Sequence, residues 1–360
     1  METQRGPEST RLADLGWDEE FARSFEPWRD DPHVQPGRVA IEFNYIYRLY
    51  VEEGELDAVR SGRLKHRATS RGELPAVGDW VALRRRPGHE TGAVVAVLPR
   101  RTRFSRRMAG QVTDEQVVAA NVGVLFIVMA LDADFSLRRL ERYLLLSRES
   151  GASPVVLLTK PDLTDDPAGR RAEVQTVAGN APVHVISPLN GDGMERVSRY
   201  LPRGYTGALV GSSGVGKTTI INRLMGTDAR KTREVRERDS KGRHTTTHRE
   251  LIVLPGGGLV IDTPGMRELQ LWDAAGAVRG TFEDIDDLAR GCHFTDCRHR
   301  GEPKCAVKAA VDDGRLDAGR LESYLKLQDE LDELEKQQDV RAQIEEKRRS
   351  KTGRAPRRGP

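Results

Sequence analysis

The sequence predicts a multidomain protein with an N-terminal OB-fold β-barrel, a central α/β P-loop domain and a C-terminal zinc-binding, mostly helical domain. Three observations predict this order. Short β-rich runs punctuated by glycine fill residues 36–107, as in a small closed barrel. From Val122 onward, apolar runs alternate with helical segments and lead into a glycine-rich loop, as in parallel α/β domains. Three cysteines then fall within 14 residues and, together with a histidine between them, form a donor set typical of zinc.

Charge is distributed unevenly along the chain, although the net charge is only +3. Residues 1–35 carry four Arg against nine Asp and Glu, whereas residues 36–107 carry fifteen Lys and Arg against eight acids. The tail from Lys347 to Pro360 has seven basic residues and no acid. Two basic regions indicate a polyanionic partner such as nucleic acid, although a lone basic tail is equally consistent with simple solvation. The expected parts are an acidic arm at 1–35, the OB-fold at 36–107, the α/β domain at 108–275, the zinc-binding domain at 276–320, and a helix with a basic tail at 321–360.

The hydropathy pattern predicts a cytoplasmic monomer. No run approaches 18 apolar residues, and no charged, apolar and small-residue pattern opens the chain, so we expect no membrane span and no secretory signal. Residues 321–347 predict a helix without sustained heptads, which favours one narrow stripe packed on the zinc domain over a dimerising coiled coil. The apolar positions of that helix are Leu321, Tyr324, Leu325, Leu331 and Leu334.

Local patterns predict the elements of the arm and the barrel. The arm contains one expected helix, Asp18–Phe25, and the polar stretch Arg107–Asn121 is expected to be a linker. Four barrel aromatics either stack on nucleic-acid bases or fill the core, and the sequence leaves both readings open. They are Phe43, Tyr45, Tyr47 and Trp80. Barrel strands are expected at Val39–Ile41, Tyr45–Val51, Asp79–Arg84 and Gly92–Leu98.

The α/β domain is predicted from buried strands and amphipathic helices. Val122–Leu131 is nearly continuously apolar, as buried parallel strands are, and Leu137–Ser150 has apolar residues at helical spacing. A further helix is expected at Thr218–Met225. Because ligands of such sheets bind at the carboxyl ends of the strands, the loops that follow the strands form the candidate site. The other strands are expected at Pro154–Leu158, Pro182–Ile186, Ala208–Val210, Glu250–Leu254 and Leu259–Ile261.

The glycine-rich loop has the pattern G-x-x-x-x-G-K-T of a phosphate loop. Its glycines let backbone N–H groups close around phosphate oxygens, and the following helix N-terminus adds a favourable dipole. Lys217 is expected to reach the β- and γ-phosphates, and the Thr218 hydroxyl is expected to bind Mg²⁺. The phosphate-binding residues are Gly211, Ser212, Ser213, Gly214, Val215, Gly216, Lys217 and Thr218.

Thr159-Lys160-Pro161-Asp162 has the character of a guanine-reading loop. The Asp162 carboxylate can accept hydrogen bonds from the guanine N1–H and exocyclic amine, a donor pair that adenine lacks. Lys160 is expected to pack its stem over the base, and the backbone near Ser187 is expected to contact the guanine oxygen. Thr159 replaces the Asn that is usual in GTPases, so we expect a looser loop that still recognises the base.

The order of the loops is the most informative feature of the chain. Asp262-Thr263-Pro264-Gly265 follows the phosphate loop, with Asp262 expected in the Mg²⁺ shell and the Gly265 N–H expected to sense the γ-phosphate. In an ordinary GTPase the guanine-reading loop comes last, whereas here it comes first. The sequence therefore predicts a circularly permuted α/β P-loop GTPase domain.

Residues 242–248 lie where switch I belongs, and either Thr246 or Thr247 is expected to reach Mg²⁺. Met266 stands where many GTPases carry the Gln that orients the attacking water. Because a thioether cannot place a water, we expect slow intrinsic hydrolysis. His248 or His244 is a candidate to position water, and a purely surface role is an equal alternative for each.

The cysteine cluster has the spacing C-x4-C-x-H-x5-C and predicts a closed structural zinc site, with a redox cluster as the alternative. Its ligands are expected to be Cys292, Cys297, His299 and Cys305. All four tetrahedral positions are then filled, which leaves none for a catalytic water. His293 is the rival nitrogen ligand, but it directly follows Cys292 and would strain to reach the same metal.

These motifs together resemble the bacterial RsgA (YjeQ) family of small-subunit-dependent ribosomal GTPases. The resemblance covers residues 35–340 and rests on T-K-P-D, G-S-S-G-V-G-K-T, G-R-H-T-T-T-H, D-T-P-G and the cysteine motif, in that order. It implies an OB-fold, a permuted GTPase domain and a zinc domain that act together on the 30S subunit and its 16S rRNA late in maturation. It also implies GTP hydrolysis to GDP that is faster on the subunit, with Mg²⁺ and one structural Zn²⁺. The departures are Thr159, the acidic arm and the long C-terminal helix with its tail.

Two other functions are weighed against this one. The first is a nucleotide-gated RNA-binding module that hardly turns over GTP, which Met266 supports. The second is an ATP-dependent P-loop kinase or ATPase for a small molecule, which Asp162 and the flanking barrel and zinc motif disfavour. From the order of the parts we further expect that the GTP state docks the domains on the 30S subunit and that hydrolysis releases them.

Overall fold

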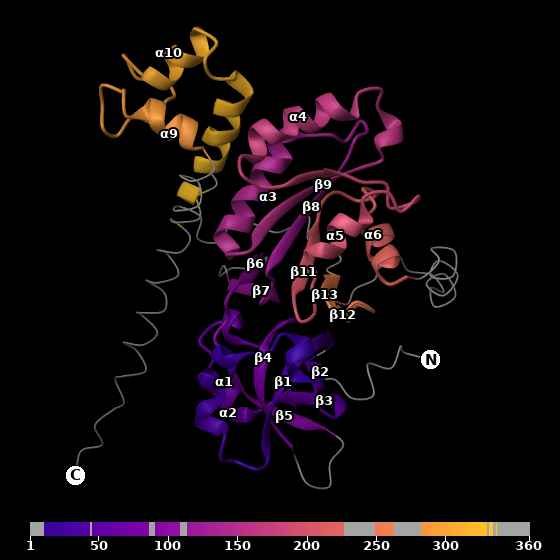
Figure 1. Ribbon diagram of the computed structural model, residues 1–360. Coiled ribbons are helices and arrows are strands. Elements are labelled where there is room, and N and C mark those ends of the chain that lie inside the picture. The colour runs from indigo at the N-terminus through magenta and orange to yellow at the C-terminus, as the bar shows by residue number, and fades with distance from the viewer. Residues whose placement is uncertain are drawn as a thin grey trace, which may run out of the picture. The chain divides into compact units, whose positions relative to one another are not determined.

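The computed structural model (Figure 1) describes residues 11–43, 45–85, 91–108, 114–226, 249–262, 282–329, 331–333 and 336. The chain forms two compact units. One comprises Met1–Arg106 and Gln116–Gln270, and the other comprises Arg107–Glu115 and Leu271–Pro360. Among the residues described, no helix has the length and hydrophobicity that a membrane crossing requires.

The first unit begins with a closed five-stranded barrel. Its strands are ordered β1-β2-β3-β5-β4, and a further pairing of β4 with β1 closes the barrel. Strands β3 and β5 are parallel and the other neighbours are antiparallel, which is the OB-fold that the sequence predicts. The strands are β1 (Val34–Phe43), β2 (Ile46–Val51), β3 (Gly54–Arg60), β4 (Trp80–Arg84) and β5 (Gly92–Val97), with helix α2 (Gly62–Arg67) and the 3-10 turn η3 (Arg71–Glu73) between β3 and β4.

The barrel core decides between the two readings of its aromatic residues. Tyr47 and Trp80 are 1% and 0% exposed, so they belong to the core and are not available for base stacking. Phe43 and Tyr45, at the β1–β2 turn, are 48% and 62% exposed. Among the described residues of the barrel, the exposed aromatic side chains are therefore those of this turn.

The acidic arm is folded onto the barrel. It contains η1 (Leu12–Leu15), α1 (Glu19–Phe25) and η2 (Glu26–Trp28), and α1 begins where Asp18 caps the backbone N–H groups of Glu20 and Phe21. The Trp17 ring packs edge-on against Trp80 with 4.8 Å between ring centroids. Arg101 pairs with Asp18 and lies 4.2 Å from the centroid of the Phe21 ring. The predicted helix is thus confirmed, and apolar and ionic contacts fasten the arm.

Residues expected to be a linker instead form part of a two-stranded sheet, β6 (Arg103–Met108) and β7 (Asp114–Ala120). The expectation of a linker was therefore wrong for residues 114–120, which form β7. The end of β7 explains the difference, because Val117, Val118, Ala119 and Ala120 are all buried. The polar residues that precede this short apolar run made the segment look like a linker in the sequence.

The α/β domain follows as an open sheet with helices on both faces (Figure 1). Strands β10-β9-β8-β11-β13 are adjacent in that order and mutually parallel. Alternate residues of β8 point to opposite faces: Ile127 packs in the cluster that contains residues of α3 and α4, and Phe126 packs in the cluster with α5 and α6. The elements are β8 (Val124–Ala130), α3 (Leu137–Ser150), β9 (Ser153–Thr159), η4 (Pro161–Leu163), α4 (Pro167–Ala178), β10 (Val183–Val185), α5 (Met194–Arg199), β11 (Thr206–Val210), α6 (Lys217–Leu224), β12 (Glu250–Val253) and β13 (Leu259–Asp262).

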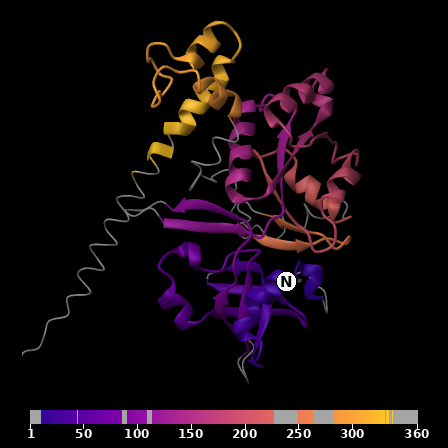
Figure 2. The same cartoon turned by 60° about the vertical axis from the view of Figure 1, so that its left-hand side comes forward.

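Strand β12 departs from the predicted parallel arrangement and connects the α/β sheet to the barrel. It pairs antiparallel with β13, because a short turn at residues 254–258 can connect only antiparallel neighbours. On its other side β12 pairs with barrel strand β1, where Ile41 lies opposite Glu250. The result is one 11-stranded sheet that runs from the α/β domain into the barrel (Figure 2).

A buried arginine fastens the arm, the barrel and the α/β domain together. Arg38 of β1 is 1% exposed and donates to the backbone oxygens of Leu15, Gly78 and Asn121 and to Oγ1 of Thr206. Burial lowers the pKa of Arg38 to about 9, so the side chain stays charged at neutral pH. Its acceptors are neutral oxygens from three parts of the first unit, and together they accept hydrogen bonds from all three of its nitrogens.

The second unit is mostly helical in its described part, as predicted. It contains α9 (Glu283–Ala289), α10 (Ala306–Asp312) and a helix that includes residues 318–329. Leu321 and Leu327 of the last helix are buried, and its Tyr324 ring packs edge-on against Phe282 at 5.4 Å. The predicted stripe is confirmed at Leu321 and Tyr324, whereas Leu325 and Leu331 are half-buried and Leu334 lies outside the described residues. Leu327 is a buried member that the sequence pattern did not single out. The basic tail lies outside the described residues.

Candidate nucleotide site and metal centre

The loops singled out by the sequence gather at one edge of the sheet. Strands β9, β10, β11 and β13 are parallel members of it, so their carboxyl ends meet there. Thr159 ends β9, Ser187 follows β10, Gly211 follows β11 and Asp262 ends β13. Ligands of open α/β sheets bind in the crevice at this edge, so the arrangement is that of a nucleotide site.

The phosphate loop has the backbone that its glycines permit. Gly211, Gly214 and Gly216 have positive φ angles of 146°, 76° and 100°, and a Cβ atom on Gly211 would lie 2.3 Å from the Val128 carbonyl oxygen. Lys217, the first residue of α6, spans the loop and donates from Nζ to the carbonyl oxygens of Gly211 at 2.8 Å and Ser212 at 2.6 Å. The ammonium group is thus held at the loop rather than in solvent, where it can neutralise phosphate charge.

Thr159 connects the expected guanine-reading loop to the phosphate loop. Its side chain is 1% exposed, and Oγ1 donates to the carbonyl oxygen of Val215 at 2.7 Å and lies 3.3 Å from that of Met129. A hydroxyl thus makes a direct bond from β9 to the phosphate loop. The looser loop expected from the Asn-to-Thr difference stays a prediction.

The two charged residues of the same loop lie differently. Lys160 adopts a left-handed conformation with φ 54° and forms an ion pair from Nζ to Oδ2 of Asp132 at 2.8 Å. The hydrogen bond from Lys160 lowers the pKa of Asp132. Asp162, two residues further on in η4, is exposed. Its carboxylate is therefore accessible to a base, while Asp132 restrains the lysine expected to cover the base.

Residues 187–191 form a tight loop after β10. The backbone N–H of Ser187 donates to the Asp192 carbonyl at 2.9 Å, and that of Gly191 donates to the Ser187 carbonyl at 2.8 Å. Arg223 of α6 donates to the carbonyl oxygens of Pro188 and Leu189. Sequence reasoning missed both Arg223 and Asp132, because each acts through a contact that only the folded chain brings together.

The remaining nucleotide-site residues are only partly described. Asp262 ends β13, two strands from β8 and next to β11, and is half-buried. The expected switch I residues Thr246, Thr247, His244 and His248 lie outside the described residues. So do Gly265 and Met266, which stay predictions of the sequence.

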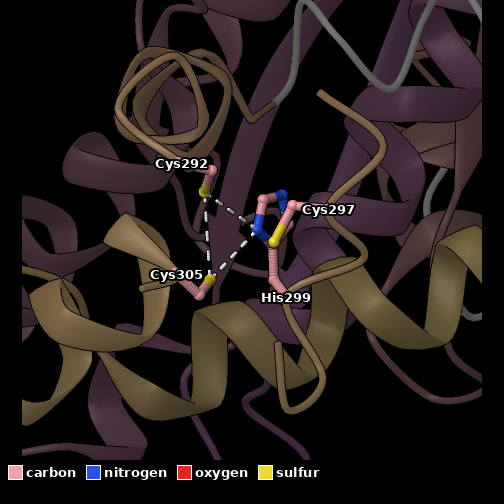
Figure 3. Close-up of side chains that lie close together, drawn as sticks. All are labelled: Cys292, Cys297, His299 and Cys305. Carbon is pink, nitrogen blue, oxygen red and sulfur yellow. Dashed lines mark hydrogen bonds between the residues drawn. The ribbon is translucent and has the colours of Figure 1, made fainter. Parts of the chain in front are cut away.

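The four expected metal ligands meet at one point of the second unit (Figure 3). Their ligand atoms all lie within 4.8 Å of one another. Sγ of Cys292 is 3.9 Å from Sγ of Cys305 and 3.6 Å from Nδ1 of His299, and that Nδ1 is 3.3 Å from Sγ of Cys305. A tetrahedral zinc with bonds of about 2.3 Å to sulfur and 2.0 Å to nitrogen separates its ligand atoms by about 3.5–3.8 Å, so the donor set fits such an ion.

Local structure prepares these side chains for a metal. His299 is 5% exposed with φ 58°, and burial lowers the pKa of its imidazole, which favours the neutral form that binds metal. Cys305 caps α10 and accepts a hydrogen bond from the Lys308 N–H at 3.5 Å, which holds its sulfur at the start of that helix. His293 is exposed and packs against Phe294, away from the cluster. Nδ1 of His299 is therefore the nitrogen that faces the sulfurs.

Known proteins resemble this chain over most of its length. The family model described as RsgA GTPase matches residues 97–272, and one described as 50S ribosome-binding GTPase matches residues 206–341. A small ribosomal subunit biogenesis GTPase RsgA of Opitutus terrae is 50% identical over 328 residues, which are 89% of each chain. A protein of the same name from Syntrophotalea carbinolica is 42% identical over 356 residues, 97% of this chain and 96% of that protein.

Solved structures extend the likeness to the fold. YjeQ from Thermotoga maritima superposes with a TM-score of 0.60 at 25% identity, covering 83% of this chain and 99% of that one. YloQ, described as a circularly permuted GTPase, superposes with a TM-score of 0.56 at 25% identity, covering 85% and 98%. The chain is a GTPase, and it belongs to the RsgA family of circularly permuted GTPases.

Proposed function

We propose that this GTPase binds the 30S ribosomal subunit and its 16S rRNA during late small-subunit maturation. On the subunit it hydrolyses GTP to GDP at a stimulated rate, and it leaves after hydrolysis. One observation carries the proposal: the likeness to proteins named for small-subunit biogenesis extends over 97% of the chain. It therefore includes the barrel and the Cys/His cluster, which an unrelated P-loop enzyme would not need.

The nucleotide site supports GTP as the substrate. Lys217 would neutralise the β- and γ-phosphates, and Asp162, Lys160, Thr159 and the Ser187 loop would hold the guanine. Bound Mg²⁺ supplies charge neutralisation at the phosphates, and its protein ligands would be Thr218, Asp262 and one of Thr246 and Thr247. His248 and Gly265 complete the proposed catalytic set.

The metal cluster supports a structural role in the second unit. Cys292, Cys297, His299 and Cys305 would hold one Zn²⁺, which contributes folding free energy because four protein ligands fill its coordination shell. The ion would cross-link α10 to the loop at residues 292–299. A preformed surface of this unit would then be available to the ribosome.

The barrel presents a surface suited to RNA. Helix α2 exposes Arg63, Lys65 and Arg67, and it directly follows β3, whose Arg60 lies 4.7 Å from the centroid of the exposed Tyr45 ring. Cations that follow a phosphate backbone beside an aromatic that stacks on a base are the elements of single-stranded RNA recognition. This surface supports rRNA, rather than a small molecule, as the partner of the barrel.

The link between the barrel and the nucleotide site supports their coupling. Strand β12 starts just after the switch I residues, and its partner β13 ends at Asp262. The same β12 pairs with barrel strand β1, and the Tyr50 hydroxyl donates to the Leu251 carbonyl at 3.2 Å. A displacement of β12 when the nucleotide changes would therefore be felt by the barrel.

The experiment that tests this function is a GTPase assay of the purified chain, alone, with 30S subunits and with 50S subunits. We expect 30S subunits, but not 50S subunits, to raise the hydrolysis rate by about ten-fold or more, a size typical of allosteric coupling. Stimulation by 50S subunits instead would favour the large subunit as the partner, in line with the family model described as 50S ribosome-binding GTPase. No stimulation, with GTP binding intact, would support a nucleotide-gated binding module and contradict the proposal.

A variant of the barrel surface makes this assay specific. Replacing Arg63, Lys65 and Arg67 with alanine should raise the 30S concentration needed for stimulation and leave the rate without ribosomes unchanged. Loss of three phosphate contacts should also reduce the slope of log affinity against log salt by about 2. The charge-matched control replaces Arg170, Arg171 and Arg196 on α4 and α5, and it should behave like the unmodified protein.

A further inference from the structure

One side chain fastens the loop after β10 to the helix that follows the phosphate loop. Arg223 lies in the last turn of α6, where its Nε donates to the Pro188 carbonyl oxygen at 3.1 Å and a terminal nitrogen donates to that of Leu189 at 2.6 Å. The acceptors are consecutive carbonyls of one loop. A planar guanidinium with fixed donor directions can satisfy both at once, which a lysine ammonium cannot do with the same geometry.

The loop is shaped around this guanidinium. Gly191 has φ 93°, and a Cβ atom there would lie 3.4 Å from a terminal nitrogen of Arg223. Burial of the apolar side chain at the tip does not hold the loop, because Leu189 is 75% exposed. Burial fixes only the start of the loop, at Ser187 and Pro188, so the position of its tip depends on internal backbone bonds and on Arg223.

Arg223 and Thr159 play similar parts, because each bonds one of the two expected guanine-binding loops to the phosphate loop or its helix. The first guanine-side loop is bonded to the phosphate loop through Oγ1 of Thr159 and the Val215 carbonyl at 2.7 Å. The second is bonded through Arg223 to α6, the helix that begins at Lys217. Both loops are thus hydrogen-bonded to the phosphate loop or to the helix that follows it, so their positions relative to the phosphates are fixed.

We propose that Arg223 is a positioning residue that sets guanine specificity by holding the backbone of the Ser187 loop at the distance from the phosphates that a guanine oxygen requires. This inference rests on the proposed guanine site. Adenine carries an amine in place of that oxygen, so an adenine nucleotide gains nothing from the loop. Arg223 then acts on the choice between bases and leaves phosphate binding unchanged.

The test compares GDP and ADP affinities of the full chain, measured by competition with a fluorescent nucleotide. Arg223→Ala should lower the ratio of GDP to ADP affinity about ten-fold, since hydrogen bonds from a charged donor contribute on that scale. ADP affinity should stay within about two-fold, and Arg223→Lys should recover part of the ratio. Arg196→Ala is the matched control, because this exposed arginine of the neighbouring α5 pairs with Glu195 and not with the loop.

Three results would overturn the assignment. An unchanged ratio in Arg223→Ala would show that the loop keeps its position without the guanidinium. Equal weakening of GDP and ADP, with a lower melting temperature in the absence of nucleotide, would show a purely structural role. Asp162→Asn, tested in parallel, should exchange guanine for xanthine preference, because xanthine has a carbonyl where guanine has its amine. If it does not, the guanine site itself is misassigned and the Arg223 proposal fails with it.

Discussion

Replacing Lys217 with alanine is expected to reduce the GTP hydrolysis rate by about 10²- to 10³-fold, the effect of removing one preorganised donor from a developing charge. The structure already holds this ammonium at the phosphate loop, 2.6 Å and 2.8 Å from two of its carbonyl oxygens. The group therefore needs little reorganisation to meet the phosphates. Single-turnover hydrolysis at saturating GTP, with and without 30S subunits, measures the effect.

The control for this variant is Lys326→Ala, which removes a lysine that pairs with Glu322 on the surface of the last helix. It should keep the unmodified rate, because exposed pairs of this kind contribute little. A Lys217→Ala rate within about three-fold of the unmodified rate, well below the loss of one such donor, would show that another group neutralises the phosphates. The phosphate-loop assignment would then be wrong in its central residue.

Removing the metal is expected to unfold the described part of the second unit while the first keeps its structure. Structural zinc contributes about 10–16 kcal/mol of apparent free energy in small domains, and the helices here are short. Cys305→Ala should therefore lose bound zinc, and protease should cleave residues 282–329 rapidly. Because the Cys305 side chain is 6% exposed, the loss also opens the packing of α10. Metal content and limited proteolysis measure the two effects, and GTP binding reports on the first unit.

His293→Ala is the matched control for the metal site, because this neighbouring histidine is exposed and lies outside the cluster. It should retain one zinc per chain and resist protease like the unmodified protein. Equal protease resistance of Cys305→Ala and the unmodified chain would contradict a structural metal. Loss of zinc in His293→Ala would mean that the nitrogen ligand is wrongly assigned.

Elements with strong local sequence signals could be predicted, whereas elements that depend on contacts between distant residues could not. The spacing of its apolar residues predicts the helix Leu137–Ser150 with its observed bounds, and in the structure Ser136 caps its start and Gly151 its end. Strand β3 was not predicted, because Glu55 and Asp57 make it look polar. In the fold these acids face Arg48 of β2, which pairs with both. Such a cross-strand pair has no sequence signal of its own.

The site divides in the same way. Loops that bind phosphate or metal have short, ordered motifs, so Lys217, Asp162 and the four metal ligands could be named in advance. Arg223 and Asp132 could not, because their partners are 35 and 28 positions away and no periodic pattern connects them. The pairing of β12 with the barrel is similar, since Tyr50 and Leu251 are 201 positions apart.

If the bound nucleotide controls docking on the small subunit, the affinity of this chain for 30S subunits must differ between its two nucleotide states. Binding is measured with saturating GDP and with a non-hydrolysable GTP analogue, at one salt concentration. We expect tighter binding with the analogue, because β12 connects the nucleotide site to the barrel. Equal affinities in the two states would contradict it.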